Sequence, residues 1–420
     1  MKQSASNGTV SCDTYPAVLR TRVRAAVVVA LGVLLAASTA CAQSTGRTPG
    51  GTFFPEVPVR GPMVLYPTLT IGGEYNDNVF LTNEQKRSDF IASFTPAVRL
   101  ALERSTYRWV AGYSFTAEKY LDNSELDNAV QRQDFFVTGF QRLSPQLTLT
   151  LSDTFVEDKN TNLVSPEEIA VGRRTSRSNA FAPGLTWQFA PETSLTASLT
   201  YTLQRFDGEG ALDSDVYRLL ADVHHDFTPR LTGIAGYEMR YLDVDGQFGI
   251  STHTARLGAT YRFTPTIVGT LILGPTVRVS KEETGVTPYA DASLTDLFSW
   301  GSASLYVNHY VGTAGGLGGT TENTSVGGIV QITTWLRDLV LEAAPRYSIS
   351  KSVGGGNAID VRSFSIDLRA AYRFTSWLAA VGGYRFFQQR SDSGSTSLAR
   401  DVDQNRLFFG VQFGYPIKFD

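Results

Sequence analysis

The stretch near the end of the chain, Arg406-Leu-Phe-Phe-Gly-Val-Gln-Phe-Gly-Tyr-Pro-Ile-Lys-Phe419, alternates between two kinds of residue. One face carries seven apolar side chains, namely Leu407, Phe409, Val411, Phe413, Tyr415, Ile417 and Phe419. The other face carries Arg406, Phe408, Gly410, Gln412, Gly414, Pro416 and Lys418. A two-residue period is the mark of a β-strand whose two faces meet different surroundings. The stretch therefore predicts a strand with one apolar face.

The same alternation recurs from about Met63 onward, for example over 195–204, 254–263, 339–350 and 363–374. Eight short links alternate with nine longer polar stretches, so the pattern predicts about 18 antiparallel strands. The chain is rich in Gly (38), Phe (25) and Tyr (18), a composition that favours strands over helices. These observations predict an all-β protein.

Long alternating strands are compatible with two architectures. In a soluble sandwich the apolar faces of two sheets pack together, whereas in an outer-membrane barrel they meet lipid. The predicted strands run roughly 11 to 16 residues, longer than the usual soluble strand of about 5–6. Aromatic residues precede many short links, as in Phe189, Phe227, Phe263, Phe298 and Phe374. We therefore predict a transmembrane antiparallel up-and-down β-barrel in the bacterial outer membrane, in contact with its lipid.

The first residues look like an export signal. Arg20, Arg22 and Arg24 precede an apolar run from Ala25 to Ala37, and Ala40-Cys41-Ala42 fits the small-residue cleavage rule. We predict a signal peptide over 1–42, a flexible periplasmic N-terminal arm over 43–62 and the barrel over 63–420. Lipidation at Cys41 and a membrane anchor are the alternatives to cleavage after Ala42.

Composition argues against several function classes. The chain has 37 Lys+Arg against 40 Asp+Glu, which gives no basic face for a nucleic acid. Four His and two Cys leave little material for a metal site, and we expect no cofactor. His224 lies beside Asp222 and Asp226, but no nucleophile with a nearby base accompanies it. We therefore expect a protein that is not an enzyme.

Two segments resemble a known family. Gly72-Gly73-Glu74-Tyr75-Asn76-Asp77-Asn78-Val79-Phe80 and the closing segment from Asn405 to Tyr415 resemble the corresponding parts of the β-barrel porin-2 family. The resemblance implies a bacterial outer-membrane barrel associated with exopolysaccharide or capsule production. It implies no catalytic residue in this chain.

The inward face of the predicted barrel is rich in charge. We predict as pore-lining the residues Arg218, Arg240, Arg256, Arg262, Arg346, Arg369, Arg373, Arg385, Arg406, Glu238, Glu342 and Asp367; Glu74, Asp222 and Asp226 share this face. In one interpretation these side chains are ion pairs that brace a wide lumen. In the other they form a basic track for an anionic solute or polysaccharide, because charged rings set the selectivity of a pore.

Three further features bear on the lumen. The long link 158–175, with Arg173, Arg174 and Arg177 at its end, is the predicted constriction. Inward aromatics could stack on sugars or pack against an inserted loop: Tyr306, Tyr310, Phe387 and Phe408. The glycine tract 312–319 lacks the Lys-Ser/Thr of a phosphate loop and predicts a mobile surface loop.

Two further interpretations concern the chain's turns and its end. Asn76-Asp77-Asn78 is compatible with calcium binding, but such clusters more often cap turns. Gln412, Gly414, Ile417 and Phe419 resemble the C-terminal strand signal that the barrel assembly machinery recognises. Pro416 lacks a ladder N–H, so we expect it at a bulge near the seam.

These observations together predict a porin-like channel for hydrophilic solutes, in the setting of exopolysaccharide export or secretion. The alternative is a non-conducting structural or interaction barrel that presents its loops to a partner.

Overall fold

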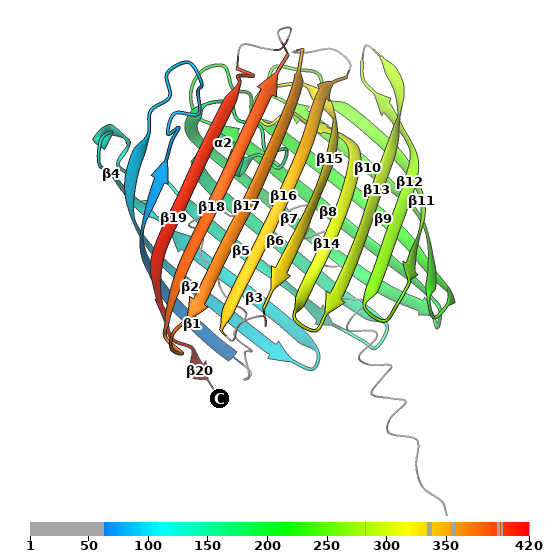
Figure 1. Ribbon diagram of the computed structural model, residues 1–420. Helices are drawn as coiled ribbons and strands as arrows, with labels where there is room; N and C mark the ends of the chain where they lie inside the picture. The colour runs from blue at the N-terminus through cyan, green and yellow to red at the C-terminus, as the bar shows by residue number, and fades with distance from the viewer. Residues whose placement is uncertain are drawn as a thin grey trace, which may run out of the picture. The chain divides into compact units, whose positions relative to one another are not determined.

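The computed structural model describes residues 63–281, 283–333, 338–353, 358–392, 395 and 398–419. The expected signal peptide (1–42) and N-terminal arm (43–62) lie outside the described residues. Within these ranges no helix has the length and apolar character that a membrane crossing requires. The described chain is instead a single ring of tilted strands (Figure 1).

The ring contains twenty strand segments over the described residues. Their bounds are β1 (Met63–Asn76), β2 (Asp89–Arg104), β3 (Tyr107–Phe115), β4 (Ala117–Tyr120), β5 (Gln133–Arg142), β6 (Leu147–Asn160), β7 (Arg173–Ala190), β8 (Thr193–Phe206), β9 (Ser214–Thr228), β10 (Leu231–Val244), β11 (Ile250–Arg262), β12 (Ile267–Val279), β13 (Thr284–Phe298), β14 (Gly301–Thr313), β15 (Thr320–Ile332), β16 (Leu339–Ser352), β17 (Asp360–Arg373), β18 (Leu378–Ser391), β19 (Val402–Gly414) and β20 (Ile417–Phe419). Two short helical turns, η2 (Ser124–Leu126) and α2 (Thr161–Val164), lie in the loops.

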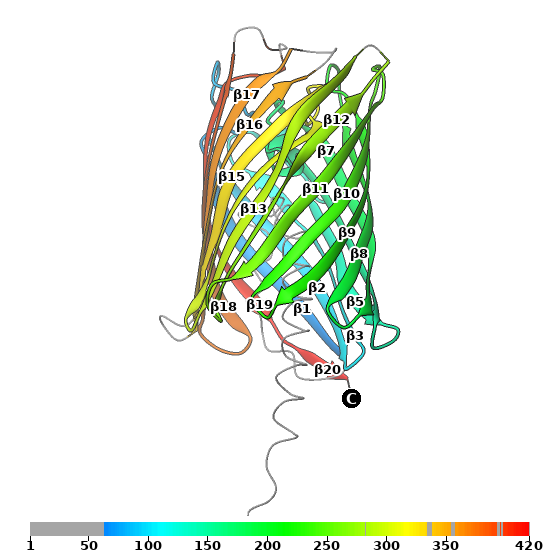
Figure 2. The ribbon, with the colours of Figure 1, turned by 90° about the vertical axis from the view of Figure 1, so that its right-hand side faces the viewer.

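Each strand pairs antiparallel with its neighbours in the chain, and the first meets the last. β1 pairs with β2 from Met63↔Leu102 to Asn76↔Asp89, and on its other edge with β19 and β20. β3 and β4 pair in succession with β2 and form one crossing, as β19 and β20 do with β1. The twenty segments thus make the predicted 18 crossings, and the barrel is closed (Figures 1 and 2).

The two ends of the barrel differ, as the link lengths predict. Short turns join the strands at the end that holds Met63 and Phe419, and the long loops lie at the other end. Several turns are fixed by a hydroxyl that accepts an N–H three residues later: Leu147 N to Ser144 Oγ (3.0 Å), Leu231 N to Thr228 Oγ1 (3.0 Å) and Ile267 N to Thr264 Oγ1 (2.9 Å). Ser and Thr favour turns through this kind of local bond.

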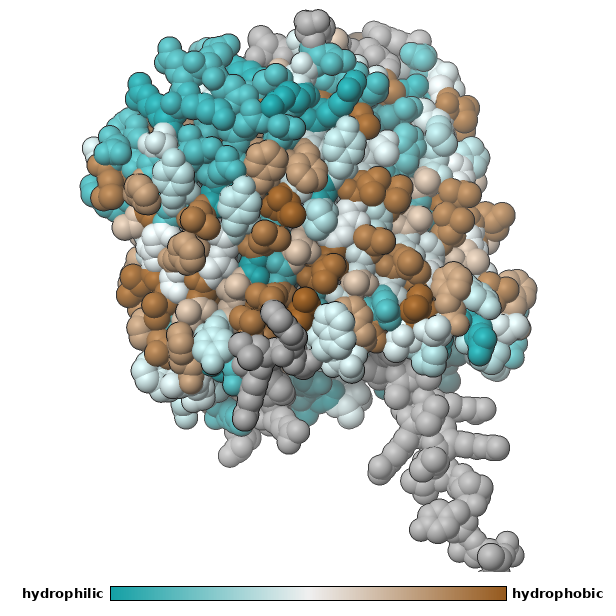
Figure 3. Space-filling model, viewed as in Figure 1, coloured by the Kyte–Doolittle hydropathy of each residue, from teal (hydrophilic) through white to brown (hydrophobic). Residues whose placement is uncertain are grey.

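The outer face of the barrel is apolar. Leu257 is 71% exposed, Phe409 64% and Leu305 61%, although large apolar side chains normally avoid water. On the face shown in Figure 3, apolar residues form a broad band across the wall, and hydrophilic residues gather at the loop end. A continuous apolar band of this kind marks a membrane surface. The closed barrel therefore spans the membrane, as bacterial outer-membrane proteins do.

Aromatic pairs lie near the turn end of the band. Trp187 contacts Phe189 with ring centroids 5.5 Å apart, and Phe298 contacts Trp300 at 4.2 Å. Such residues form the girdles at the membrane–water interface.

The seam between the first and last strands contains the predicted interruption. β19 ends at Gly414, β20 begins at Ile417, and Pro416 lies between them. Proline has no N–H to donate, so the ladder breaks at this point. Inside the barrel, Gln412 Nε2 donates to Thr70 Oγ1 across the seam (3.2 Å). The position near the seam is as predicted, but the expected bulge is absent, because β1 keeps one register with Gly414 (Thr68) and with Ile417 (Leu65) on either side of the interruption.

The prediction that the glycine tract lies on the surface was wrong. Residues 311–321 are buried, and they fold into the mouth of the barrel instead of extending into solvent. Gly316 has φ +92°, and a Cβ there would lie 3.1 Å from the Phe206 ring. Missing side chains allow the backbone to pack this closely. A glycine-rich sequence is compatible with a mobile loop and with a tightly packed one.

We predict that Leu257→Arg, on the lipid face at mid-strand, destabilises the barrel by about 2–4 kcal/mol. Thr260→Arg, on the same strand but facing the lumen, should lower the free energy of unfolding much less, because water in the lumen solvates the new guanidinium. Denaturant unfolding in lipid vesicles measures both. Equal destabilisation by the two variants would contradict the assignment of the faces.

Candidate functional site: a loop across the lumen

The segment between β6 and β7 folds into the barrel. Residues 161–171 are buried apart from Pro166, and Thr161, Asn162, Ile169 and Ala170 are fully inaccessible. This is the core of the predicted constriction 158–175, and we call residues 161–172 the inserted loop.

Polar side chains close the base of the inserted loop. Asp158 Oδ1 accepts bonds from the backbone N (2.7 Å) and Nδ2 (2.9 Å) of Asn160, which turns the chain inward. Thr161 Oγ1 donates to Gly172 O (3.0 Å) and accepts from Val171 N (2.9 Å). Side chains that bond to nearby backbone favour a turn over continued strand.

The inserted loop reaches the opposite wall. Arg346 Nη2 on β16 donates to Pro166 O (2.9 Å), and Ser348 Oγ on the same strand donates to Glu167 O (3.3 Å). Gln389 on β18 exchanges two bonds with the Ala170 backbone, N to Oε1 (2.8 Å) and Nε2 to O (2.9 Å). Because β16–β18 lie across the ring from β6 and β7 in the pairing order, the loop spans the lumen.

Glu168 is the most constrained residue of the inserted loop. Its φ is +56°, a left-handed conformation that side chains other than glycine rarely adopt. Its carboxylate accepts a 2.6 Å bond from Ser365 Oγ and lies 3.6 Å from Arg385 Nη2 and 4.0 Å from Arg346 Nη1. Backbone strain persists where surrounding contacts hold it. These contacts fix the loop to β16, β17 and β18.

The predicted arginines occupy the inward face, interleaved with acids. Glu238 Oε2 lies 2.7 Å from Arg218 Nη2, and Glu238 Oε1 lies 2.6 Å from Arg240 Nε. Arg256 Nε lies 3.1 Å from Asp222 Oδ1, and its Nη1 also donates to the Tyr289 hydroxyl. This cluster on β9, β10, β11 and β13 matches the interpretation of ion pairs that brace the lumen.

A second group lies on β16–β18, under the inserted loop. Arg369 Nη1 is 3.3 Å from Glu342 Oε1, and Arg385 Nη1 is 3.1 Å from Asp367 Oδ2. The Arg385 side chain is 1% exposed, so it is covered by protein.

Arg262 and Arg373, which are half-buried, face inward near the turn end. Asp226 is exposed near the turn end as well, and Thr232 Oγ1 donates to its Oδ1 (2.5 Å).

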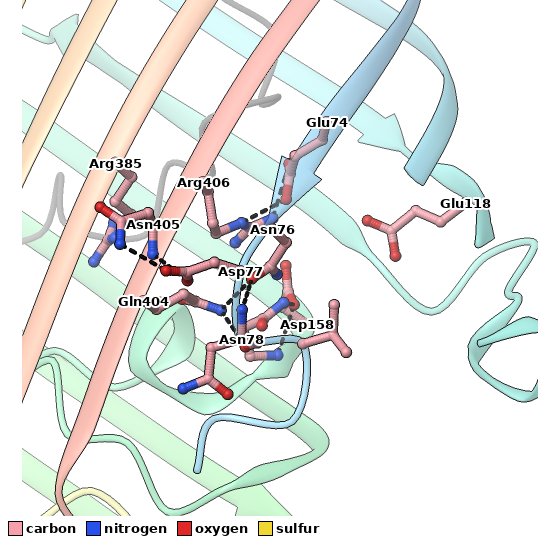
Figure 4. Close-up of polar contacts among 12 residues, drawn as sticks. Glu74, Asn76, Asp77, Asn78, Glu118, Asp158, Arg385, Gln404, Asn405 and Arg406 are labelled. Atoms are coloured by element: carbon pink, nitrogen blue, oxygen red, sulfur yellow. Dashed lines mark hydrogen bonds and ion pairs between the residues drawn. The ribbon is translucent and has the colours of Figure 1, made fainter. Parts of the chain in front are cut away.

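A third network, next to the seam, includes residues that sequence reasoning missed. Arg406 Nε lies 2.6 Å from Glu74 Oε1 (Figure 4). Glu118 Oε1 lies 2.7 Å from Arg132 Nη1, and Arg132 Nε lies 3.5 Å from Asp158 Oδ2. All five side chains are buried. Glu118 was identifiable in principle, because it continues the inward register of β3, but Arg132 lies in a loop and no periodicity indicates its direction.

The Asn76-Asp77-Asn78 segment caps a turn beside this network. Asn78 N donates to Asn76 Oδ1 (3.0 Å), and Asp77 accepts from Asn405 N (2.6 Å) and Asn405 Nδ2 (2.7 Å) (Figure 4). These oxygens are engaged in hydrogen bonds, as the turn interpretation requires. Within the described ranges no group of three or more His, Cys, Asp or Glu side chains is placed to hold a metal ion.

The four inward aromatics fall into two groups. Phe387 is fully buried and packs with Leu81 and Ala170, and Phe408 is buried as well, so these two support the packing interpretation. The Tyr310 ring lies beneath the Arg240 guanidinium, 4.6 Å from its carbon. Tyr306 is half-buried on the inward face.

Water has access to the lumen on the turn side of the inserted loop. Thr138 and Thr150 face inward and are exposed, and Ser198 is half-buried. On the loop side the same walls are closed, since Ser176 and Gln204 are at most 2% exposed. The site is thus a polar vestibule that ends at the inserted loop.

The comparison with solved structures gives matches of low sequence identity and modest TM-score. Pseudomonas aeruginosa OccK11 (OpdR) gives a TM-score of 0.40 at 14% identity, over 84% of this chain and 96% of that chain. Acinetobacter baumannii OccAB4 gives 0.42 at 12%, over 86% and 100%. P. aeruginosa OccK2 (OpdF), solved in complex with glucuronate, gives 0.42 at 11%, over 85% and 98%. No protein-family model and no curated protein sequence matches the chain. The barrel assignment rests on the strand pairing.

Glu167 makes the inserted loop sensitive to pH. Burial raises the pKa of this carboxyl, and hydrogen bonds from its own backbone N–H and from the Ser165 hydroxyl, together with the nearby Arg346, oppose the shift only in part. Ionisation in place therefore costs free energy, so the inserted loop is most stable below the ordinary glutamate pKa and is weakened as pH rises from there through the raised pKa.

We predict that hydrogen exchange of residues 161–172 is slower, after correction for the intrinsic pH effect, at pH 5 than at pH 8. Glu167→Gln should remove this difference, because it cannot ionise. A pH dependence that persists in Glu167→Gln would show that another group controls the loop.

Proposed function

We propose that the protein is an outer-membrane channel for small hydrophilic solutes, in which the inserted loop sets the size of the passage. The observation that carries this proposal is the loop itself, which crosses a wide polar lumen and is held on the far wall by Arg346, Ser348 and Gln389. An 18-stranded barrel is too wide for its wall side chains to fill alone. A loop that narrows the lumen converts a large pore into a selective one.

The vestibule supports a hydrophilic solute. Hydroxyl side chains such as Thr138, Thr150 and Ser198 line its wall near the turn end, and arginine–carboxylate clusters lie deeper. A solute that passes through can exchange its hydrogen bonds to water for hydrogen bonds to these side chains. The predicted pore-lining role of the inward arginines and acids remains part of this proposal. It favours those with exposed side chains, such as Arg218 at 25%, over the covered Arg385 and Arg406.

Small solutes fit this lumen better than a polymer does. Export of exopolysaccharide, which the family resemblance implies, would require the inserted loop to leave the lumen, because an extended polymer needs a continuous passage. The contacts of Glu168 and Gln389 oppose such a movement.

The chain end supports a role in assembly. We propose that Gln412, Gly414, Ile417 and Phe419 form the signal for the barrel assembly machinery. Ile417 and Phe419 are 41% and 42% exposed on the outer face, where a partner could reach them. The short β20 pairs with β1 over three residues.

The rival function is a barrel that conducts nothing and presents its loops to a partner. Planar-bilayer recording of the purified protein separates the two. We predict that replacing residues 163–170 by Gly-Gly raises the single-channel conductance at least about twofold, since it removes the constriction.

Deletion of residues 84–86 is the matched control, because these lie in an exposed loop. It should leave the conductance unchanged. If the 163–170 variant folds and is as silent as a lipid-only bilayer, the channel function is wrong.

We further predict that Arg369→Glu with Arg373→Glu shifts ion selectivity toward cations, because both side chains face inward on β17. The reversal potential in a salt gradient measures the shift. Arg362→Glu, on the outward face of the same strand, is the control. An unchanged reversal potential in the double variant would remove these arginines from the passage.

A further inference from the structure

The loop end of the barrel contains an apolar cluster that is separate from the strand pairing that closes the barrel. Its buried members are Ile169, Val171, Phe206, Ala314, Leu317, Ile359 and Val361, with Ala211, Leu398 and Ala399 packed at its edge. We call this cluster the lid. Its residues come from five of the long loops and the strand ends beside them. Ile169 and Leu317 are fully inaccessible to water.

The position of the lid is unusual for its chemistry. The surrounding loops are hydrophilic on their outer side (Figure 3), and the walls below carry arginine–carboxylate clusters. An apolar plug between two aqueous compartments excludes water and ions without any covalent block, and hydrophobic constrictions gate channels in this way.

Leu317 is the centre of one face of the lid. It lies on a tight turn, with its N–H donating to Ala314 O (3.1 Å). Four glycines around it have positive φ: Gly315 (+52°), Gly316 (+92°), Gly318 (+75°) and Gly319 (+99°). This backbone can turn at many points, because glycine lacks the Cβ that restricts other residues.

The two loops that meet in the lid are attached in different ways. The inserted loop is fixed to the wall by Arg346, Ser348 and Gln389. The contacts of residues 314–319 with neighbouring loops include apolar packing and the bond from Leu212 N to Gly316 O (3.0 Å). Apolar packing has no fixed direction, so it is lost and regained more readily than a set of hydrogen bonds. We therefore expect residues 314–319, and not the inserted loop, to be the part of the lid that moves.

We propose that the lid is a hydrophobic gate, which opens when residues 314–319 swing away from Ile169 and Phe206 on their glycine turns. The closed state is the one in this structure. The proposal rests on the channel function, because a gate has no role in a barrel that conducts nothing. It assigns to the glycine tract a function distinct from that of the inserted loop, which narrows the passage but stays in place.

The first test makes the gate polar. Leu317→Ser places a hydroxyl in the apolar cluster at a position that is inaccessible to water, and so favours the open, hydrated state. We expect the open probability in planar bilayers to rise at least about tenfold. Leu121→Ser is the matched control, because Leu121 is 68% exposed on a different loop.

The second test cross-links the gate in its closed state. An ideal Cβ at Gly315 lies 3.4 Å from Ile169 Cβ, close to the Cβ separation in a disulfide, but it would clash with the Ser165 hydroxyl. Ser165→Ala is therefore included in every variant of this series and in its reference protein. Ile169→Cys combined with Gly315→Cys should therefore cross-link the lid on oxidation. We expect the oxidised form to conduct at least about tenfold less often than the same protein after reduction. The two single-cysteine variants should show no redox effect.

The outcomes are distinguishable from a failure of the channel proposal. If the wild-type protein conducts and neither Leu317→Ser nor the cross-link changes its open probability, the gate is wrong and the channel stands. If every folded variant is silent, including Leu317→Ser, the channel is wrong and the gate with it. If Leu317→Ser does not fold, the oxidised and reduced cysteine pair decides: equal conductance overturns the gate.

Discussion

The structure depends on one constraint, which is that every backbone N–H and C=O inside a hydrocarbon layer must find a partner in the protein. A strand satisfies this requirement only through its neighbours, so a sheet in lipid must close on itself. Here closure is made by β1, which pairs with β2 on one edge and with β19 and β20 on the other. The apolar outer face follows, because the same strands must also be wetted by lipid.

Closure with 18 crossings creates a second problem, which is an interior wider than side chains can fill. The protein fills it in three ways. The inserted loop crosses the lumen, ion-pair networks such as Glu74–Arg406 occupy the seam side, and apolar residues from several loops close the mouth. Buried charges of this kind require partners. The remaining vestibule is the space that a solute can enter.

The barrel could be predicted from the sequence because the alternation along each strand shows which side chains share a face. The alternation over 406–419 and the sequence of short and long links predicted the strand count and the faces, and the missing N–H of Pro416 predicted an irregularity near the seam. The inserted loop was placed by its length and charge alone.

The interior contacts were beyond sequence reasoning, since they join distant segments. Nothing near Glu168 indicates that it meets Ser365, and nothing in residues 312–319 distinguishes a packed glycine turn from a mobile one. Loops lack the two-residue period that shows to which side each side chain of a strand points.

The central claim, that lipid wets the outer face, is tested most directly by spin labels on single cysteines at consecutive positions 407–413 in reconstituted vesicles. We predict that labels at Leu407, Phe409, Val411 and Phe413 have their relaxation enhanced by oxygen dissolved in the membrane. Labels at Phe408, Gly410 and Gln412 should show little access to oxygen. Odd-numbered labels that are as shielded from oxygen as the even-numbered ones would mean that a second protein sheet covers this face, and would contradict the account.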